Sequence, residues 1–165
     1  MRTIVHTGAT PDAPLTIERS VLAVPGIQLH VRGRCRTPEE VLAAVKDADI
    51  ALCSGEPYTE AVFAGAPQLL AVIRYGIGVD TIDLEAATRH GVMAVNFPDF
   101  CIREVANHAL ALLLTCARRV LQHDRAIRTE GWAATRRYRS QVGTIHDETL
   151  GLIAFGHIAQ ALAVR

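Results

Sequence analysis

The residues with the clearest capacity for chemistry lie near the C-terminus, in the run Ala154-Phe155-Gly156-His157-Ile158-Ala159. This run approximates the pattern G-x-G-x-x-G, in which glycines permit a tight turn and let the backbone approach a pyrophosphate. The N–H groups at the start of the following helix then point at the anion. The pattern tolerates alanine at its third position, but Ala154 at the first position is a departure, because a Cβ is unfavourable where φ must be positive. An ordinary strand–turn–helix without a ligand is the alternative.

A second glycine-rich segment, Gly76-Ile77-Gly78, follows a predicted strand at residues 68–73. Ligands of open α/β sheets bind at the carboxyl ends of strands, so this segment is placed to offer backbone N–H groups to an anion. A strand-to-helix turn that needs glycine only for its geometry explains the same residues equally well.

The histidines offer no alternative centre. The seven histidines show neither a Ser-His-Asp order nor a metal-ligand spacing. His108 falls among apolar neighbours in a predicted helix and is expected to be a buried structural residue. His90, next to Gly91, is expected at a helix C-terminus, where the dipole favours a cation. The sequence therefore predicts no catalytic residue and no metal site.

The elements that must position these segments alternate from the first residues onward. Short apolar runs predict strands, and the segments between them predict helices, with Thr37 and Asp83 as N-terminal caps. The predicted strands are residues 4–6, 28–31, 48–53, 68–73 and 92–95. This alternation, with strands that are apolar almost throughout, predicts an α/β fold with a doubly wound parallel sheet and helices on both faces.

The second part of the chain has a different pattern. Apolar residues from residue 102 to about residue 128 follow the three-four spacing of one long helix, which is suited to connect two domains. Residues 129–147 are polar and irregular and are expected to form a loop. Residues 150–155 are predicted to form a strand, followed by a tight turn and a helix over residues 158–165.

Composition excludes several classes of partner. Lys+Arg and Asp+Glu both number 17, and a formal net charge of zero attracts the chain neither to nucleic acid nor to an anionic membrane. No apolar stretch approaches the ~20 residues of a membrane span, and the N-terminus lacks the hydrophobic region of a signal peptide. The four cysteines have no metal-binding spacing and suit a reducing compartment. We therefore expect a soluble cytoplasmic protein.

Several segments share motifs with one known family. They are residues 69–87, Gly91, and residues 95–98, 104–113, 131–132 and 149–163. Together they resemble the D-isomer-specific 2-hydroxyacid dehydrogenase family. Asp99-Phe100-Cys101 and Ala159 are most similar to the branch of the C-terminal-binding proteins and the phosphoglycerate-dehydrogenase-like enzymes. Residues 1–68 match only in their pattern of elements.

The resemblance implies two domains. Residues 1–100 would be the N-terminal part of a flavodoxin-like substrate domain, and residues 101–165 an inter-domain helix and the first βα unit of an incomplete Rossmann domain that binds NAD. Gly76, Ile77 and Gly78 would bind the carboxylate of a small 2-hydroxy or 2-oxo acid.

The resemblance also implies where NAD is bound. Ile77 and Val105 would belong to the cofactor site. Gly156, His157 and Ile158 would hold the pyrophosphate, and His157 would contribute its backbone N–H rather than its side chain.

In this family the catalytic arginine, glutamate and histidine lie far downstream of the glycine motif, and the resemblance places all three beyond residue 165. The ribose-binding acid, ~20 residues past the motif, would also lie there. We therefore expect the N-terminal part of an NAD-dependent oxidoreductase, present as a truncated chain that is inactive alone and binds NAD weakly. A non-catalytic binding module that retains the substrate domain is the alternative. The apolar long helix and tail are expected to be mobile in a monomer or buried against a second copy of the chain.

Overall fold

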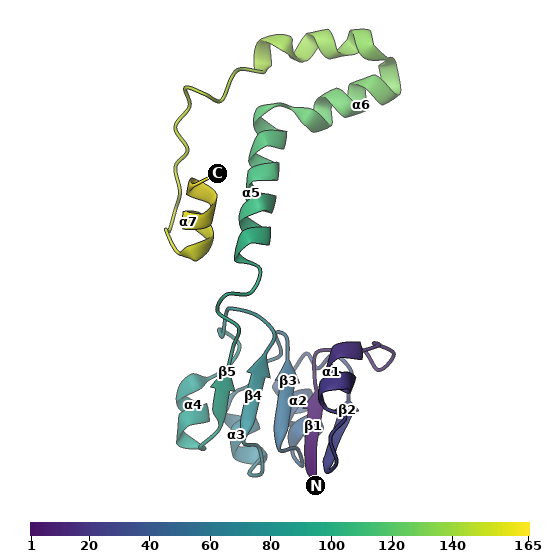
Figure 1. Cartoon of the computed structure of the whole chain (residues 1–165), viewed down its shortest axis with the longest axis vertical. Helices are drawn as coiled ribbons and strands as arrows, with labels where there is room; N and C mark the ends of the chain where they lie inside the picture. Colours follow the sequence, from purple (N-terminus) through teal and green to yellow (C-terminus); the bar gives the residue numbers. More distant parts are fainter. The chain divides into compact units, whose positions relative to one another are not determined.

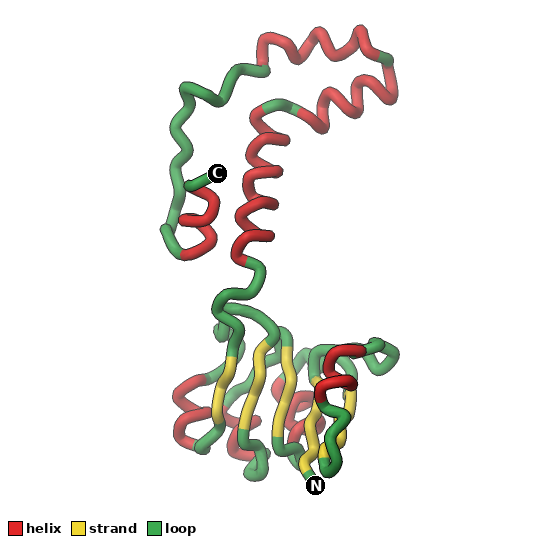
Figure 2. Tube along the Cα trace, in the orientation of Figure 1, coloured by secondary structure: helices red, strands yellow, loops and turns green.

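Five short apolar strands form an all-parallel sheet in the order β2-β1-β3-β4-β5 (Figures 1 and 2). The computed structural model describes all 165 residues, which divide into two compact units, Met1–Phe100 and Cys101–Arg165. The strands are β1 (Arg2–His6), β2 (Ile27–Val31), β3 (Ile50–Cys53), β4 (Ala71–Arg74) and β5 (Met93–Val95). This strand order is that of flavodoxin-like folds, so the predicted doubly wound parallel sheet is confirmed.

Four helices accompany the sheet in the N-terminal unit. They are α1 (Thr16–Val21), α2 (Pro38–Val45), α3 (Glu60–Gly65) and α4 (Leu84–Arg89). In Figure 1, α2 and α3 lie behind the sheet and α1 lies in front of it. The core contains inward-facing residues of the strands and of α2, α3 and α4, among them Val5, Ala51, Val72, Val41, Val45, Phe63 and Ala86.

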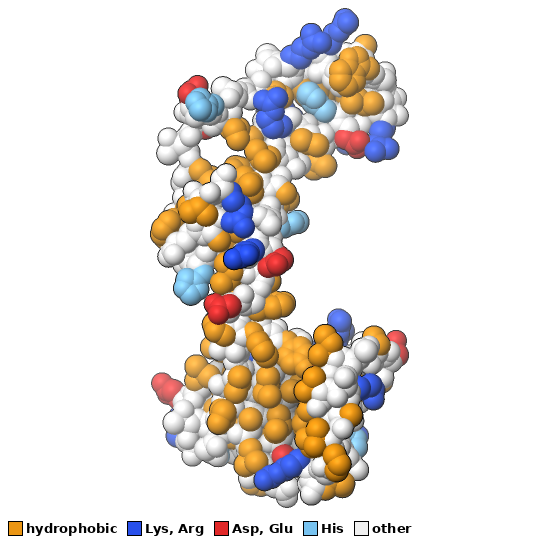
Figure 3. Space-filling model, in the orientation of Figure 1, with side chains coloured by type: hydrophobic (Ala, Val, Ile, Leu, Met, Phe, Trp, Pro, Cys, Tyr) orange, Lys and Arg blue, Asp and Glu red, His pale blue; other side chains and the backbone are white.

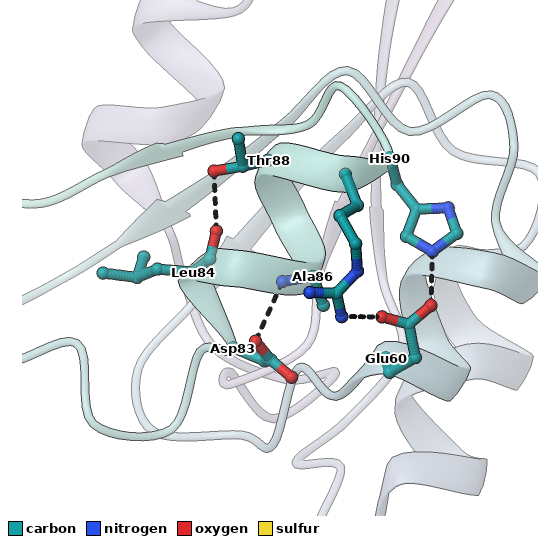
Figure 4. Close-up of polar contacts among 7 residues, drawn as sticks. Glu60, Asp83, Leu84, Ala86, Thr88 and His90 are labelled. Carbon is teal, nitrogen blue, oxygen red and sulfur yellow. Dashed lines mark hydrogen bonds and ion pairs between the residues drawn. The ribbon is translucent and has the colours of Figure 1, made fainter.

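Local capping residues explain where two of these helices begin. The Thr37 side chain accepts a hydrogen bond from the Glu40 N–H at 3.3 Å. Asp83 Oδ1 accepts one from the Ala86 N–H at 2.9 Å (Figure 4). Both caps are confirmed. Gly91 follows α4 with a φ of +69°, the left-handed conformation that glycine adopts at little cost.

An acid on α3 links this helix to the end of α4. Glu60 pairs with Arg89 and with His90, whose Nε2 lies 2.6 Å from Glu60 Oε1 (Figure 4). These hydrogen bonds, first from His90 and then from Arg89, hold the pKa of Glu60 below its ordinary value. His90 caps the C-terminus of α4, as the sequence predicts.

The front of the sheet is only partly covered. Residues that alternate with the core-facing ones form an apolar surface beside α1, and Figure 3 shows hydrophobic side chains gathered over this unit. A groove of about 470 Å³ lies there, lined among others by Ile17, Val21, Leu52, Ile73, Tyr75, Phe97 and Phe100.

Two elements of this unit differ from the prediction. Helix α1 is not predicted by the sequence. Strand β4 covers residues 71–74 rather than 68–73, because residues 66–69 form a turn closed by a bond from the Leu69 N–H to Ala66 O.

The prediction of one long helix in the C-terminal unit is wrong. The helix is broken into α5 (Ile102–Ala117) and α6 (Val120–Glu130), because Arg119 adopts a left-handed φ of +50°. A 3-10 helix, η1 (Trp132–Gln141), lies where a loop was expected, and α7 (His157–Ala163) packs against α5. No helix of the chain is both long enough and apolar enough to cross a lipid bilayer.

Two further expectations for this unit are wrong. Residues 150–155 form no strand, because a strand requires a neighbour to accept its backbone hydrogen bonds and this unit contains none (Figure 2). His108 is exposed on α5 rather than buried. The apolar pattern around it was misleading, because the exposed side of α5 also carries Leu112 and Cys116.

Candidate functional site

The backbone after β4 is held between the two neighbouring strands. The Tyr75 N–H donates to Cys53 O at 2.8 Å, and the Phe97 N–H donates to Gly76 O at 3.0 Å. These bonds extend the parallel ladders beyond β3, β4 and β5. They fix Gly76-Ile77-Gly78, here termed the glycine loop, at the carboxyl edge of the sheet, where ligands of such folds bind.

The glycine loop offers hydrogen-bond donors. The N–H groups of Ile77 and Gly78 donate no hydrogen bond within the chain, whereas the carbonyls of the same residues are occupied. Asn96 Nδ2 donates to Ile77 O at 2.8 Å, and Arg74 Nε donates to Gly78 O at 3.0 Å. Gly78 is an exposed residue.

Opposite charges flank the glycine loop. Arg74 takes part in no ion pair, and Cβ atoms placed on Gly55 and Gly76 would lie 3.8 Å from its guanidinium. The guanidinium therefore lies between the turns that follow β3 and β4. Asp80 also lies beside the loop, with Oδ2 3.0 Å from the position of a Cβ on Gly78. An anion bound at the loop would be attracted by Arg74 and repelled by Asp80.

Three rings in edge-on contact lie at the ends of the strands beside the glycine loop. The His6 ring meets the Tyr75 ring edge-on at 5.4 Å, and Tyr75 meets Phe97 in the same way at 6.3 Å. Burial, followed by the nearby Glu18 carboxylate, raises the pKa of Tyr75 to about 12, so the phenol stays neutral. The aromatic contacts join β1 to the loops after β4 and β5.

His6 is buried at the end of β1 and is held as the neutral base. Its Nδ1 accepts hydrogen bonds from the N–H groups of Gly8 and Ala9, both at 3.1 Å. Burial lowers the pKa of His6, although the carboxylates of Glu18 and Glu56 act in the opposite direction. The imidazole therefore shapes the turn after β1.

Glu56 stabilises the turn after β3. Its buried Oε2 accepts from the Ser54 N–H at 2.7 Å, the Gly55 N–H at 3.3 Å and Thr7 Oγ1 at 3.4 Å. Thr7 Oγ1 also lies 3.0 Å from the Tyr58 hydroxyl. This network connects the carboxyl ends of β1 and β3.

The glycine loop is recognisable in the sequence, but the residues that support it are not. His6, Glu56, Arg74 and Asn96 each lie at the end of a strand or within three residues after one. That position was the available signal, because the carboxyl ends of parallel strands meet at one edge of the sheet.

The predicted cofactor residues of the C-terminal unit lie on two helices. Val105 is exposed on α5, Gly156 is the N-cap of α7, and His157 and Ile158 begin that helix. Ala154 has a φ of +67°, which is the conformation that makes glycine favourable at the first position of the fingerprint. The helix start is thus present, but the strand that should precede it is not.

Comparisons with known proteins agree with the fold and with these motifs. Residues 13–155 match the model of the D-isomer specific 2-hydroxyacid dehydrogenase catalytic domain. The D-3-phosphoglycerate dehydrogenase of Mycobacterium leprae is 39% identical over an alignment of 154 residues that covers 90% of this chain and 28% of that enzyme. The glyoxylate reductase of Pyrococcus furiosus is 37% identical over 137 residues, 77% of this chain and 39% of that enzyme.

A solved structure supports the same relationship. The NADPH-dependent glyoxylate/hydroxypyruvate reductase of Sinorhizobium meliloti, in complex with NADP and malonate, superposes with a TM-score of 0.74 at 25% identity. The match covers 99% of this chain and 49% of that structure, so the chain spans about half of the solved relative and less of the two curated ones. The chain belongs to the D-isomer-specific 2-hydroxyacid dehydrogenase family.

Proposed function

We propose that residues 1–100 supply the substrate site of an NAD-dependent oxidoreductase, which transfers a hydride between the nicotinamide and C2 of a small 2-hydroxy or 2-oxo acid. The observation that carries this proposal is the pair of unbonded N–H groups on Ile77 and Gly78, near the guanidinium of Arg74, which donates to Gly78 O but forms no ion pair. Two successive N–H donors and a nearby cation suit a carboxylate, because charge-assisted hydrogen bonds are the stronger ones. In this proposal Gly76, whose carbonyl is already bonded, shapes the loop around the acid.

We assign residues 101–165 to the inter-domain helix and the start of the NAD-binding domain. Val105, Gly156, His157 and Ile158 would contact NAD, together with Ile77 of the glycine loop. The start of α7 contributes a few N–H groups and a dipole worth about 0.3–1 kcal/mol when exposed. The entropic cost of binding is several kcal/mol, so residues 1–165 alone should bind NAD weakly.

Residues 1–165 should show no dehydrogenase turnover by themselves. None of them takes the place of the arginine, glutamate and histidine that the family resemblance assigns to catalysis. An assay with NADH and a panel of 2-oxo acids checks this expectation. Turnover above a blank that is abolished by a substitution within residues 1–165 would contradict it.

We further propose that the C-terminal unit associates with a second copy of the chain in a cytoplasmic setting. Its exposed apolar residues favour self-association, among them Leu112, Leu121, Trp132, Ile153 and Phe155. The four free cysteines fit a reducing compartment.

The substrate site is tested by following backbone amide signals in an NMR titration with glyoxylate. The Ile77 and Gly78 signals should shift saturably with glyoxylate and remain unchanged with its methyl ester, which lacks the carboxylate. Arg74→Gln should weaken the response. Gly91, whose turn lies at the end of α4, supplies a control signal. Shifts that are absent from Ile77 and Gly78, or equal for the acid and the ester, would contradict the proposal.

A further inference from the structure

Three successive carbonyls of the glycine loop are bonded by groups from outside the loop. The Phe97 N–H donates to Gly76 O at 3.0 Å, Asn96 Nδ2 to Ile77 O at 2.8 Å, and Arg74 Nε to Gly78 O at 3.0 Å. Each donor follows or ends a strand of the sheet. The loop is therefore held at every carbonyl, while the N–H groups of Ile77 and Gly78 remain unbonded.

Peptide geometry links these bonds to the direction of the free N–H groups. All peptide bonds of the chain are trans, so each carbonyl points opposite to the N–H group in the same plane. The Gly76 carbonyl shares its plane with the Ile77 N–H, and the Ile77 carbonyl shares its plane with the Gly78 N–H. A donor on the carbonyl side therefore directs the N–H group to the opposite side.

The two peptide planes are not held equally firmly. The plane between Gly76 and Ile77 is fixed by a backbone bond from Phe97, which any residue except proline can make. The plane between Ile77 and Gly78 is fixed by the Asn96 side chain. This second plane also ends at a glycine, which reaches both signs of φ and so permits the plane to rotate. Its orientation depends on Asn96.

We propose that Asn96 is a positioning residue that directs the Gly78 N–H toward the substrate carboxylate; this inference rests on the function proposed above. The amide of Asn96 acts through the peptide plane and does not touch the substrate. Aspartate has almost the same shape but cannot donate when ionised, so it removes the donor and leaves the volume unchanged.

The test compares Asn96→Asp and Asn96→Ala with Asn107→Asp, a control that introduces the same charge on α5. Residual dipolar couplings of the free protein report the direction of the Gly78 N–H. They should change in both Asn96 variants and stay unchanged in the control. In a glyoxylate titration, the affinity of the Asn96 variants should fall about tenfold or more. The Gly78 signal should lose its response, while the Ile77 signal, directed by Phe97, keeps it.

The outcomes separate this inference from the proposed function. If the wild-type protein does not respond to glyoxylate but the Gly78 coupling changes in Asn96→Asp, the positioning is correct and the proposed ligand is wrong. If Asn96→Asp and Asn96→Ala retain the wild-type coupling and the wild-type Gly78 response, the positioning role is overturned. Asn96→Ala adds no charge and carries the test if Asn96→Asp fails to fold.

Discussion

The Oε2 atom of Glu56 lies 2.7 Å from the backbone nitrogen of Ser54, so that a buried carboxylate closes the turn after β3. Because the same oxygen also accepts from Gly55 and Thr7, Glu56→Ala would leave the part-buried N–H groups of Ser54 and Gly55 without their acceptor and remove one partner of the buried Thr7 hydroxyl. We expect the free energy of unfolding to fall by about 1–3 kcal/mol, as measured by urea denaturation. Glu148→Ala, at an exposed position, should change it by less than about 0.5 kcal/mol. Equal effects of the two substitutions would contradict this role of Glu56.

Stability should decrease in weak acid because of His6. Burial lowers the pKa of His6 from its ordinary value of 6.5, so the unfolded chain binds a proton at a pH where the folded chain does not. The neutral His6 side chain therefore makes its full contribution to stability above pH 6.5. As the pH falls below 6.5 this contribution is lost, and the free energy of unfolding decreases by up to about 1.4 kcal/mol per pH unit. His6→Gln should remove this dependence, whereas the exposed His146→Gln should retain it. Urea unfolding between pH 5 and pH 8 gives both slopes, and identical slopes would exclude His6 as the cause.

A glycine at position 154 should stabilise the C-terminal unit. Ala154 has a φ of +67°, and a left-handed conformation costs a non-glycine residue about 1–2 kcal/mol. Ala154→Gly should therefore slow hydrogen exchange in α7. Ala161→Gly, inside the same helix, should accelerate it, because glycine is unfavourable in a helix interior. Acceleration by both substitutions would show that the turn does not require glycine.

The helix caps and the class of the sheet could be predicted from the sequence, whereas a local break in conformation and contacts between distant residues could not. The caps Thr37 and Asp83 depend on atoms three residues away, and the strand–helix alternation reflects burial of each element by itself. The break at Arg119 lies in a continuous apolar pattern, so periodicity gave no sign of it. Residues 150–155 have the composition of a strand, but a strand also needs a partner, which composition does not reveal.

The same distinction holds for the candidate site. The glycine loop is visible as a motif, whereas the bond from Asn96 to Ile77 joins residues 19 positions apart. The pairing depends on β4 and β5 being neighbours in register, which the sequence order alone does not establish.

The tail should be unprotected in a dilute monomer. Residues 150–155 donate no backbone hydrogen bond, and Ile153 and Phe155 are exposed. Hydrogen exchange there should be close to that of an unstructured peptide and should slow as the protein concentration rises and a second copy covers these residues. Ala51 and Leu52 of β3 should remain protected at both concentrations. Strong protection of residues 150–155 in a proven monomer would contradict this expectation.

The position of the bound carboxylate decides whether the glycine loop is the substrate site. A crystal structure of the chain grown with glyoxylate should show carboxylate oxygens about 2.7–3.2 Å from the backbone nitrogens of Ile77 and Gly78. The Asn96 amide should remain bonded to Ile77 O on the opposite side of the peptide. Glyoxylate bound at another position, with these two N–H groups still without an acceptor, would show that the glycine loop does not bind the substrate carboxylate.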